Sequence, residues 1–197
     1  APFFRTPAVR DESMNTLPRL TDNDFVLFGL PERHSLDRTR LDERRRALQA
    51  EVHPDRFAAQ GATAQRLAMQ WAVRVNEGHA RLKDPLKRAA YLCELRGVPV
   101  DAERNTAMPA DFLLRQMQWR EALDEAVDGA DATAAIAAVE ALDQEVARDE
   151  RAGLARLEQL LDDAGDTAAA AGEVRALMFV ARFREDVARR LEALDEH

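Results

Sequence analysis

Residues 36–83 read LDRTRLDERRRALQAEVHPDRFAAQGATAQRLAMQWAVRVNEGHARLK, and this stretch decides the fold class. Its first part favours a helix over about residues 36–52, with Ser35 as a candidate N-cap. The apolar residues of that helix recur on one face, at Leu41, Leu48 and Val52. Pro54 ends the helix, because proline disfavours helical geometry in the residue before it. A second helix is expected over about residues 62–83, so the two should pack as an antiparallel hairpin with a short loop.

Helices are predicted on both sides of this hairpin. The apolar segment 25–28 precedes it, and a helix over residues 85–95 follows. Every proline lies at or before Pro109, and the Ala-, Glu-, Arg- and Leu-rich remainder of the chain favours helix. Three helices are expected there, over about residues 110–128, 131–163 and 167–195. Gly153 is a weak point at which the middle one of these can bend.

Composition and charge narrow the class of protein. The chain has 197 residues, of which 46% are hydrophobic and 32% charged, which excludes a disordered or collagen-like chain. Residues 1–100 carry 17 Lys+Arg against 13 Asp+Glu (net +4), whereas residues 101–197 carry 11 against 23 (net −12). This asymmetry indicates either two modules with different partners or simply a soluble acidic bundle. Phosphate would repel the acidic half, and no apolar run approaches the roughly 20 residues that span a membrane, so neither nucleic acid nor membrane is expected as a partner.

The loop between the two hairpin helices contains the tripeptide His53–Pro54–Asp55. Pro54 fixes its own backbone and holds the turn. Asp55 can accept loop N–H groups or meet a cation of a partner, and His53 can donate and accept hydrogen bonds at a contact surface. The preceding helix is basic and includes Arg44, Arg45 and Arg46. Taken alone, the tripeptide also fits chance occurrence, and the arginines also fit a solvated helix face.

The tripeptide in its context resembles the J domain of DnaJ-type co-chaperones. Four segments extend the resemblance to the HscB family, the J-proteins of iron–sulfur cluster assembly: QAEVHPDRF (49–57), RVNEGHARLKDPLKRAAYL (74–92), DFLLRQMQWREALDEA (111–126) and VRALMFVARF (174–183). The resemblance covers about residues 22–195, with both modules in the right order. DPLKRAAYL and FLLRQMQWREALDE make it specific to this family, because ordinary J-proteins lack both.

The resemblance implies an all-α, L-shaped protein. Its N-terminal J domain would consist of the antiparallel helical hairpin plus short helices, and its C-terminal domain would be a three-helix bundle that binds a scaffold protein. The expected limits are 21–98 for the J domain, 99–109 for a linker and 110–197 for the bundle. Residues 1–20 are expected to be disordered or partly an artificial extension, and they contain no secretory apolar segment.

The resemblance also implies two protein partners. The J domain would bind a DnaK/HscA-type chaperone through His53–Asp55 and stimulate its ATPase. Arg44–Arg46 would dock on an acidic surface of that ATPase domain, where charge pairing mainly governs encounter rate and orientation. The bundle would bind an IscU-type iron–sulfur scaffold protein, so that the bridge between the partners promotes cluster transfer. We expect a bacterial cytoplasmic location, because the Cys-rich module of some eukaryotic relatives and a transit signal are missing.

The helix over residues 110–128 carries more apolar residues than one core face uses. One face holds Phe112, Trp119, Leu123 and Val127, and roughly opposite lie Leu113, Leu114 and Met117, beside Glu121. In the last helix, Met178 and Phe179 are expected to point off the core stripe. These surplus residues either fill gaps inside the bundle or form an exposed patch. By the resemblance, the scaffold contacts are Leu113, Leu114, Met117, Gln118, Glu121 and Phe179, with Gln118 replacing an acidic residue of the bacterial pattern.

Catalytic and cofactor-binding motifs are missing from the sequence. It contains no GxxxxGK[ST], GxGxxG, HExxH or GxSxG, and its four histidines share no metal-ligand spacing, so we expect no metal and no cofactor. The single cysteine, Cys93, is expected to be a small buried apolar residue. We predict a non-enzymatic activator of a partner ATPase. The alternatives are a general J-protein delivering other clients, a helical interaction protein with an accidental tripeptide, and an enzyme with an unrecognised site.

Overall fold

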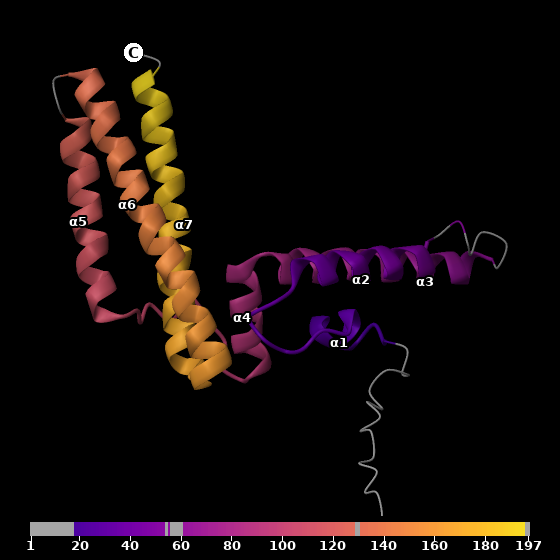
Figure 1. Cartoon of the computed structure of the whole chain (residues 1–197). Coiled ribbons are helices and arrows are strands. Elements are labelled where there is room, and N and C mark those ends of the chain that lie inside the picture. The colour runs from indigo at the N-terminus through magenta and orange to yellow at the C-terminus, as the bar shows by residue number, and fades with distance from the viewer. Residues whose placement is uncertain (1–17, 54, 56–60, 129–130, 196–197) are drawn as a thin grey trace, which may run out of the picture. The chain divides into compact units, whose positions relative to one another are not determined.

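The computed structural model describes residues 18–53, 55, 61–128 and 131–195, and every regular element among them is helical (Figure 1). In chain order they are α1 (Asp24–Phe28), α2 (Arg38–Glu51), α3 (Ala62–Lys83), α4 (Pro85–Leu95), α5 (Ala110–Val127), α6 (Ala132–Glu158), the π-helical turn η3 (Gln159–Ala164) and α7 (Thr167–Asp195). The predicted all-α class is confirmed, and the predicted helices lie where these elements lie. Residues 1–20 were expected to be disordered or partly an artificial extension. Of these, residues 1–17 lie outside the described part of the chain.

Contacts within the described residues gather into two compact units. The first holds residues 18–32 and 36–80, and the second holds residues 33–35 and 81–195. Helix α4 groups with the second unit because it packs against α7. The sequence analysis places the end of the first domain at residue 98, whereas the contacts divide the chain between residues 80 and 81. The expected limits refer to parts that fold independently, and they stay a prediction.

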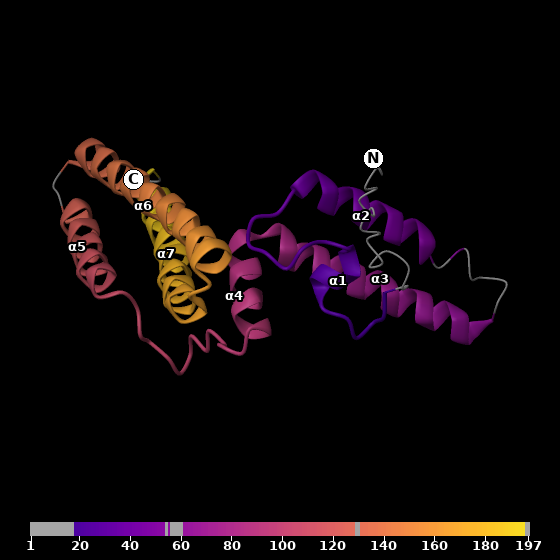
Figure 2. The same cartoon turned by 60° about the horizontal axis from the view of Figure 1, so that its bottom comes forward.

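The first unit is the antiparallel hairpin of α2 and α3, joined by hydrogen bonds from Arg45 and Gln49 to Asn76, with the short helix α1 alongside it (Figure 2). The Asn23 side chain accepts a hydrogen bond from the Val26 N–H and begins α1, and Gly29 ends the helix with a left-handed φ of 60°. The N-cap of α2 is Asp37, which accepts from two backbone N–H groups, and not the expected Ser35. The core of the unit comes from all three helices, with Phe25, Leu27, Phe28, Leu41, Leu48, Ala68 and Val75 buried.

Arg74 holds the start of the described chain on α3. Its Nη1 lies 2.6 Å from the buried Asp24 carboxylate, and the same guanidinium donates to the carbonyls of Leu20 at 3.2 Å and Asp22 at 2.7 Å. An arginine that satisfies a buried carboxylate and two backbone carbonyls together orders the segment that leads into α1.

The second unit contains the predicted bundle of three helices, α5, α6 and α7, which lie side by side in both views (Figures 1 and 2). Its core cluster takes residues from each helix: Phe112, Trp119, Leu123, Val139, Leu142, Val146, Ala176, Val180, Phe183 and Val187. The Trp119 indole N–H donates to Glu145 at 3.0 Å, which fixes α5 against α6. Arg184 spans from α7 to Asp143 and Glu150 of α6. The predicted bundle is confirmed.

The segment 99–109, expected to be a polar link, is tied to the side of α7. Arg175 Nε donates to the Ala107 carbonyl at 2.6 Å, and its Nη1 donates to the Val100 carbonyl at 3.0 Å. Arg175 is itself buried, so these bonds satisfy a guanidinium that has left water. The entry of the chain into α5 is therefore positioned by α7.

Candidate interaction surfaces

The loop tip of the first unit presents the side chains that the tripeptide predicts. His53 and Asp55 follow the end of α2, and their side chains are 59% and 90% exposed. The Asp55 backbone N–H donates to His53 Nδ1 at 3.3 Å, which leaves Nε2 as the proton donor of the neutral ring. Pro54, the third predicted residue, lies outside the described part of the chain. The two described side chains are accessible to a partner protein.

The structure gives the three arginines of α2 different surroundings. Arg44 Nε donates to the Phe28 carbonyl at 3.0 Å and so closes the end of α1. Arg45 donates to Asn76 of α3 at 3.2 Å and ties the two helices of the hairpin together. Arg46 is exposed and bonds to none of the described residues. Arg46 therefore fits the predicted docking role best, because its guanidinium is exposed and unbonded among the described residues. The sequence analysis did not foresee the contacts that Arg44 and Arg45 make within the unit.

Helix α5 exposes a second apolar face. Leu114 and Met117 are each 66% exposed and Leu113 is 39% exposed, while Phe112, Trp119 and Leu123 on the other face are buried. Gln118 and Glu121 are exposed beside them. Because large apolar side chains at such exposure do not fill gaps in the bundle, these residues form a surface patch. We call Leu113, Leu114 and Met117 the α5 patch.

Phe179 differs from the sequence expectation, because it lies at the edge of the core and does not point off it. Its ring centroid is 5.7 Å from that of Phe112 in an edge-on contact and 6.2 Å from that of Phe183 in a stacked one. It is half-buried and packs against the core cluster. The periodicity of α7 predicted that Phe179 lies off the apolar stripe that faces the core. Its ring instead packs between those of Phe112 on α5 and Phe183 on α7. Phe179 also contacts Arg120 of α5, whose guanidinium lies over its ring.

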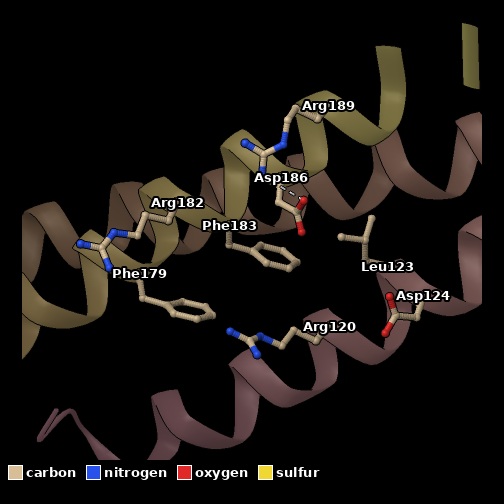
Figure 3. A pocket seen from close by; sticks show the side chains of 8 residues that line it. All are labelled: Arg120, Leu123, Asp124, Phe179, Arg182, Phe183, Asp186 and Arg189. Carbon is tan, nitrogen blue, oxygen red and sulfur yellow. Dashed lines mark hydrogen bonds and ion pairs between the residues drawn. The ribbon is translucent and has the colours of Figure 1, made fainter. Parts of the chain in front are cut away.

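A pocket of about 550 Å³ lies between α5 and α7 (Figure 3). Leu123 and Phe183 contribute apolar lining, and Arg120 extends from α5 toward Phe179, with its Cζ 5.2 Å from the ring centroid. Charged side chains of α7 complete the walls: Arg182, Asp186 and Arg189. The sequence analysis missed this pocket. The arginines that line it are Arg120 on α5 and Arg182 and Arg189 on α7, and nothing in the local sequence indicates that these two helices are neighbours.

Two side chains that could carry catalytic chemistry, His34 and Cys93, are buried. The side chain of His34 is buried, and burial together with the nearby Arg88 cation lowers its pKa from 6.5 to about 4. Cys93 is buried as predicted, and burial raises the pKa of its thiol, which disfavours the reactive thiolate. Within the described ranges, no three His, Cys, Asp or Glu side chains cluster in a way that could hold a metal ion. The helices of the same ranges include none that is both long and apolar enough to cross a membrane.

Comparison with known proteins adds independent findings. Residues 108–188 match the family model described as the HSCB C-terminal oligomerisation domain. The chain is 48% identical over 176 residues to the co-chaperone protein HscB homolog of Burkholderia multivorans, covering 89% of this chain and 98% of the relative. It is 46% identical over 178 residues to the homolog of Cupriavidus taiwanensis, covering 90% and 98%.

Solved structures are similar as well. Chaperone HscB from Vibrio cholerae matches with a TM-score of 0.72 and 37% sequence identity, over 88% of this chain and 99% of that one. The human co-chaperone HscB matches with a TM-score of 0.76 over 94% and 93%, and at 20% identity it supports the fold alone.

The hairpin with its exposed tip, followed by a bundle with an exposed apolar patch, defines a helical co-chaperone with a J domain. The extent and identity of the matches then identify the family: this chain belongs to the HscB co-chaperones. As a co-chaperone it acts in iron–sulfur cluster assembly by assisting a chaperone, and it is not itself an enzyme.

Proposed function

We propose that this co-chaperone binds an IscU-type iron–sulfur scaffold with the α5 patch and stimulates the ATPase of a DnaK/HscA-type chaperone with its loop tip. The observation that carries the proposal is the pairing of two exposed surfaces on different units of one chain. His53 and Asp55 are exposed on the first unit, and Leu114 and Met117 are exposed on the second. A chain with two such surfaces is suited to hold two proteins at once.

The loop tip supports the chaperone contact through its chemistry. An exposed imidazole and an exposed carboxylate can bond to backbone and charged groups of a partner without first breaking strong internal contacts. Arg46 adds a cation that the described residues leave free, and an acidic surface on the ATPase domain would orient it during encounter. The neighbouring Arg44 and Arg45 keep α1, α2 and α3 in place, so they support the tip from within the unit.

The α5 patch supports the scaffold contact through its exposed apolar area. Contiguous exposed apolar side chains mark interaction sites, and a few of them supply most of the binding energy of an interface. Gln118 and Glu121 beside the patch would form its polar rim, and the exposed part of Phe179 would extend it toward α7.

Bridging explains how binding would promote cluster transfer. A co-chaperone that holds the scaffold and the chaperone together raises the effective concentration of one at the other. Contact with the loop tip would then promote ATP hydrolysis, which closes the chaperone on the scaffold. The chemistry of hydrolysis belongs to the chaperone, the iron–sulfur cluster is cargo, and the proposed location is the bacterial cytoplasm.

The substitution His53→Gln tests the loop tip. We expect it to abolish stimulation of the chaperone ATPase, because glutamine cannot reproduce the planar ring with a donor at Nε2 and an acceptor at Nδ1. The measurement is steady-state ATP hydrolysis by the chaperone with increasing co-chaperone, in the presence and absence of the scaffold.

Thermal unfolding of the variant provides the control. His53 is exposed and makes its one described hydrogen bond to its own loop, so the midpoint should stay unchanged. Full stimulation by a folded His53→Gln protein would remove the loop from the mechanism. If ATPase stimulation requires the loop tip but unrelated unfolded proteins increase it as much as the scaffold does, the result would instead favour a general J-protein.

A further inference from the structure

The groove between α5 and α7 changes from apolar to charged along its length. On α5, one stripe at helical spacing contains Leu113, Met117, Arg120 and Asp124. On α7, the facing stripe contains Phe179, Arg182, Asp186 and Arg189. The two helices run in the same direction, so their apolar ends lie together and their charged ends lie together (Figure 1). Leu113 and Met117 of the α5 patch therefore share a helix face with Arg120, which lies one turn after Met117 and lines the pocket shown in Figure 3.

The charges in the pocket leave an excess of cation. Asp186 is paired with Arg189 at 3.2 Å. Arg120 lies over the Phe179 ring, and Arg182 is exposed; among the described residues neither has an ion pair. With Asp186 paired, Asp124 is the other carboxylate among the pocket-lining residues. The two guanidinium groups of Arg120 and Arg182 therefore stand against one carboxylate. This local excess stands out because residues 101–197 carry a net charge of −12.

We propose that the pocket extends the scaffold-binding surface and that Arg120 and Arg182 receive a carboxylate of the bound scaffold protein. The inference rests on the proposed function, because it concerns the partner that the α5 patch binds. Guanidinium groups are suited to this role, since they stay charged and donate several N–H groups in the geometry that carboxylates accept. Arg120 is also held in position by its contact with Phe179.

The length of the groove indicates which kind of segment fits. Leu113 and Arg120 are seven residues apart, which is about 10 Å along a helix. An amphipathic segment of the scaffold that lays apolar side chains on the α5 patch would place an Asp or Glu roughly two helical turns further on over the pocket. The apolar contacts would supply affinity, and the carboxylate would set the direction and register of the segment.

Charge reversal at Arg182 tests the inference. Because Arg182 is exposed and unpaired among the described residues, Arg182→Glu should leave the fold intact and weaken scaffold binding by roughly tenfold, with a reduced dependence of affinity on salt. Arg151→Glu, also exposed but on α6 and outside the pocket, is the matched control and should change affinity by less than about twofold. The measurement is titration calorimetry of the full chain with the IscU-type scaffold at two salt concentrations.

A panel of scaffold variants identifies the carboxylate. Each exposed Asp or Glu of the scaffold is changed to Lys in turn, and one of these variants should regain affinity for the Arg182→Glu protein while losing it for the unchanged chain. Such a reciprocal swap measures the coupling of one pair of charges directly.

Other outcomes would overturn the inference. If Arg182→Glu binds the scaffold normally while Leu114→Ala/Met117→Ala does not, the pocket is not part of the surface, although the proposed function stands. If neither change affects binding, the proposed function itself is wrong. If Arg182→Glu alters only the sedimentation of the chain alone, the groove binds a second copy. If inorganic phosphate binds the pocket and scaffold affinity does not depend on Arg182, it is a small-anion site.

Discussion

His34 shows how a residue without any role in binding can govern stability. It is buried, its backbone N–H donates to Asp162 of η3 at 2.7 Å, and its carbonyl accepts from Arg88 Nε, also at 2.7 Å. Asp162 accepts the Ser35 N–H as well. Ser35 is not the N-cap of α2 because the helix begins at Arg38, which places Asp37 at the cap position. The segment 33–35 is thus anchored by backbone bonds, while the imidazole remains in an apolar, partly cationic site that favours its neutral form.

The low pKa of His34 predicts a loss of stability in mild acid. In the unfolded chain the ring takes up a proton below pH 6.5, whereas in the folded protein its pKa is about 4, so acid favours the unfolded state between these values. Between pH 7.5 and pH 5 the contribution of this group to the free energy of unfolding should fall by about 2 kcal/mol. Urea denaturation at both pH values measures it.

The variant His34→Gln isolates this contribution, since carboxylates also titrate in acid. It should be less stable at pH 7.5, because it disturbs a packed site, but should lose less stability than the unchanged protein on going to pH 5. Equal losses in the two proteins would show that His34 does not remain neutral in the folded state.

At the scale of elements, the close approach of α6 and α7 determines how the bundle packs. Gly153 was expected to be a weak point, yet α6 continues through it as helix. Its lack of a side chain has a packing reason: a Cβ there would lie 2.8 Å from Glu173 Oε1 and 2.8 Å from Leu177 Cδ2. Glu173 is held in place by Arg156 at 2.7 Å, so it cannot move aside without losing that ion pair.

Gly153→Ala should therefore destabilise the protein, although alanine is the better helix former. We expect a loss of about 1–3 kcal/mol in the free energy of unfolding, as for other overpacked sites. The matched control is Gly172→Ala on α7, where the nearest side-chain atom to a Cβ would be Arg175 Nη2 at 3.7 Å. That variant should gain up to about 1 kcal/mol from helix propensity. If both variants gain stability by the same amount, the two helices do not approach as closely as described.

On the scale of the whole molecule, the proposed function depends on both units belonging to one chain. The loop tip is in the first unit, and the α5 patch is in the second. Loss of one surface should leave the other intact, because their exposed side chains belong to separate cores. The L shape implied by the family resemblance stays a prediction.

The double variant Leu114→Ala/Met117→Ala tests this separation. The chaperone ATPase should still be stimulated by the variant alone, but the synergy between co-chaperone and scaffold should disappear, because bridging requires both contacts. Steady-state ATPase assays with and without scaffold measure this. Phe179 is left unchanged, because its removal would also disrupt ring contacts in the core.

Met69→Ala on α3 provides the matched control, since Met69 is a methionine of similar exposure outside α5. Scaffold affinity should be unaffected by that change. Synergy that persists in the Leu114→Ala/Met117→Ala protein would place the scaffold contact elsewhere on the chain.

The sequence by itself determined the helices and the general kind of protein. Helix limits follow from local features, such as Pro54, Gly29 and the cap Asp84, and from apolar periodicity, all of which act within a few residues. The exposed tip and the second face of α5 followed from the same local patterns, and the resemblance to the HscB family rested on contiguous motifs.

Only the tertiary structure decided which helix faces meet. It drew Phe179 into the edge of the core, gave Arg44 and Arg45 partners on other helices, grouped α4 with α7, and brought Arg120 of α5 into one pocket with Arg182 and Arg189 of α7. These features depend on residues far apart in the chain, whose rotation and separation are set by packing across the whole unit. A local pattern specifies a face of a helix, but the neighbour of that face is a property of the fold.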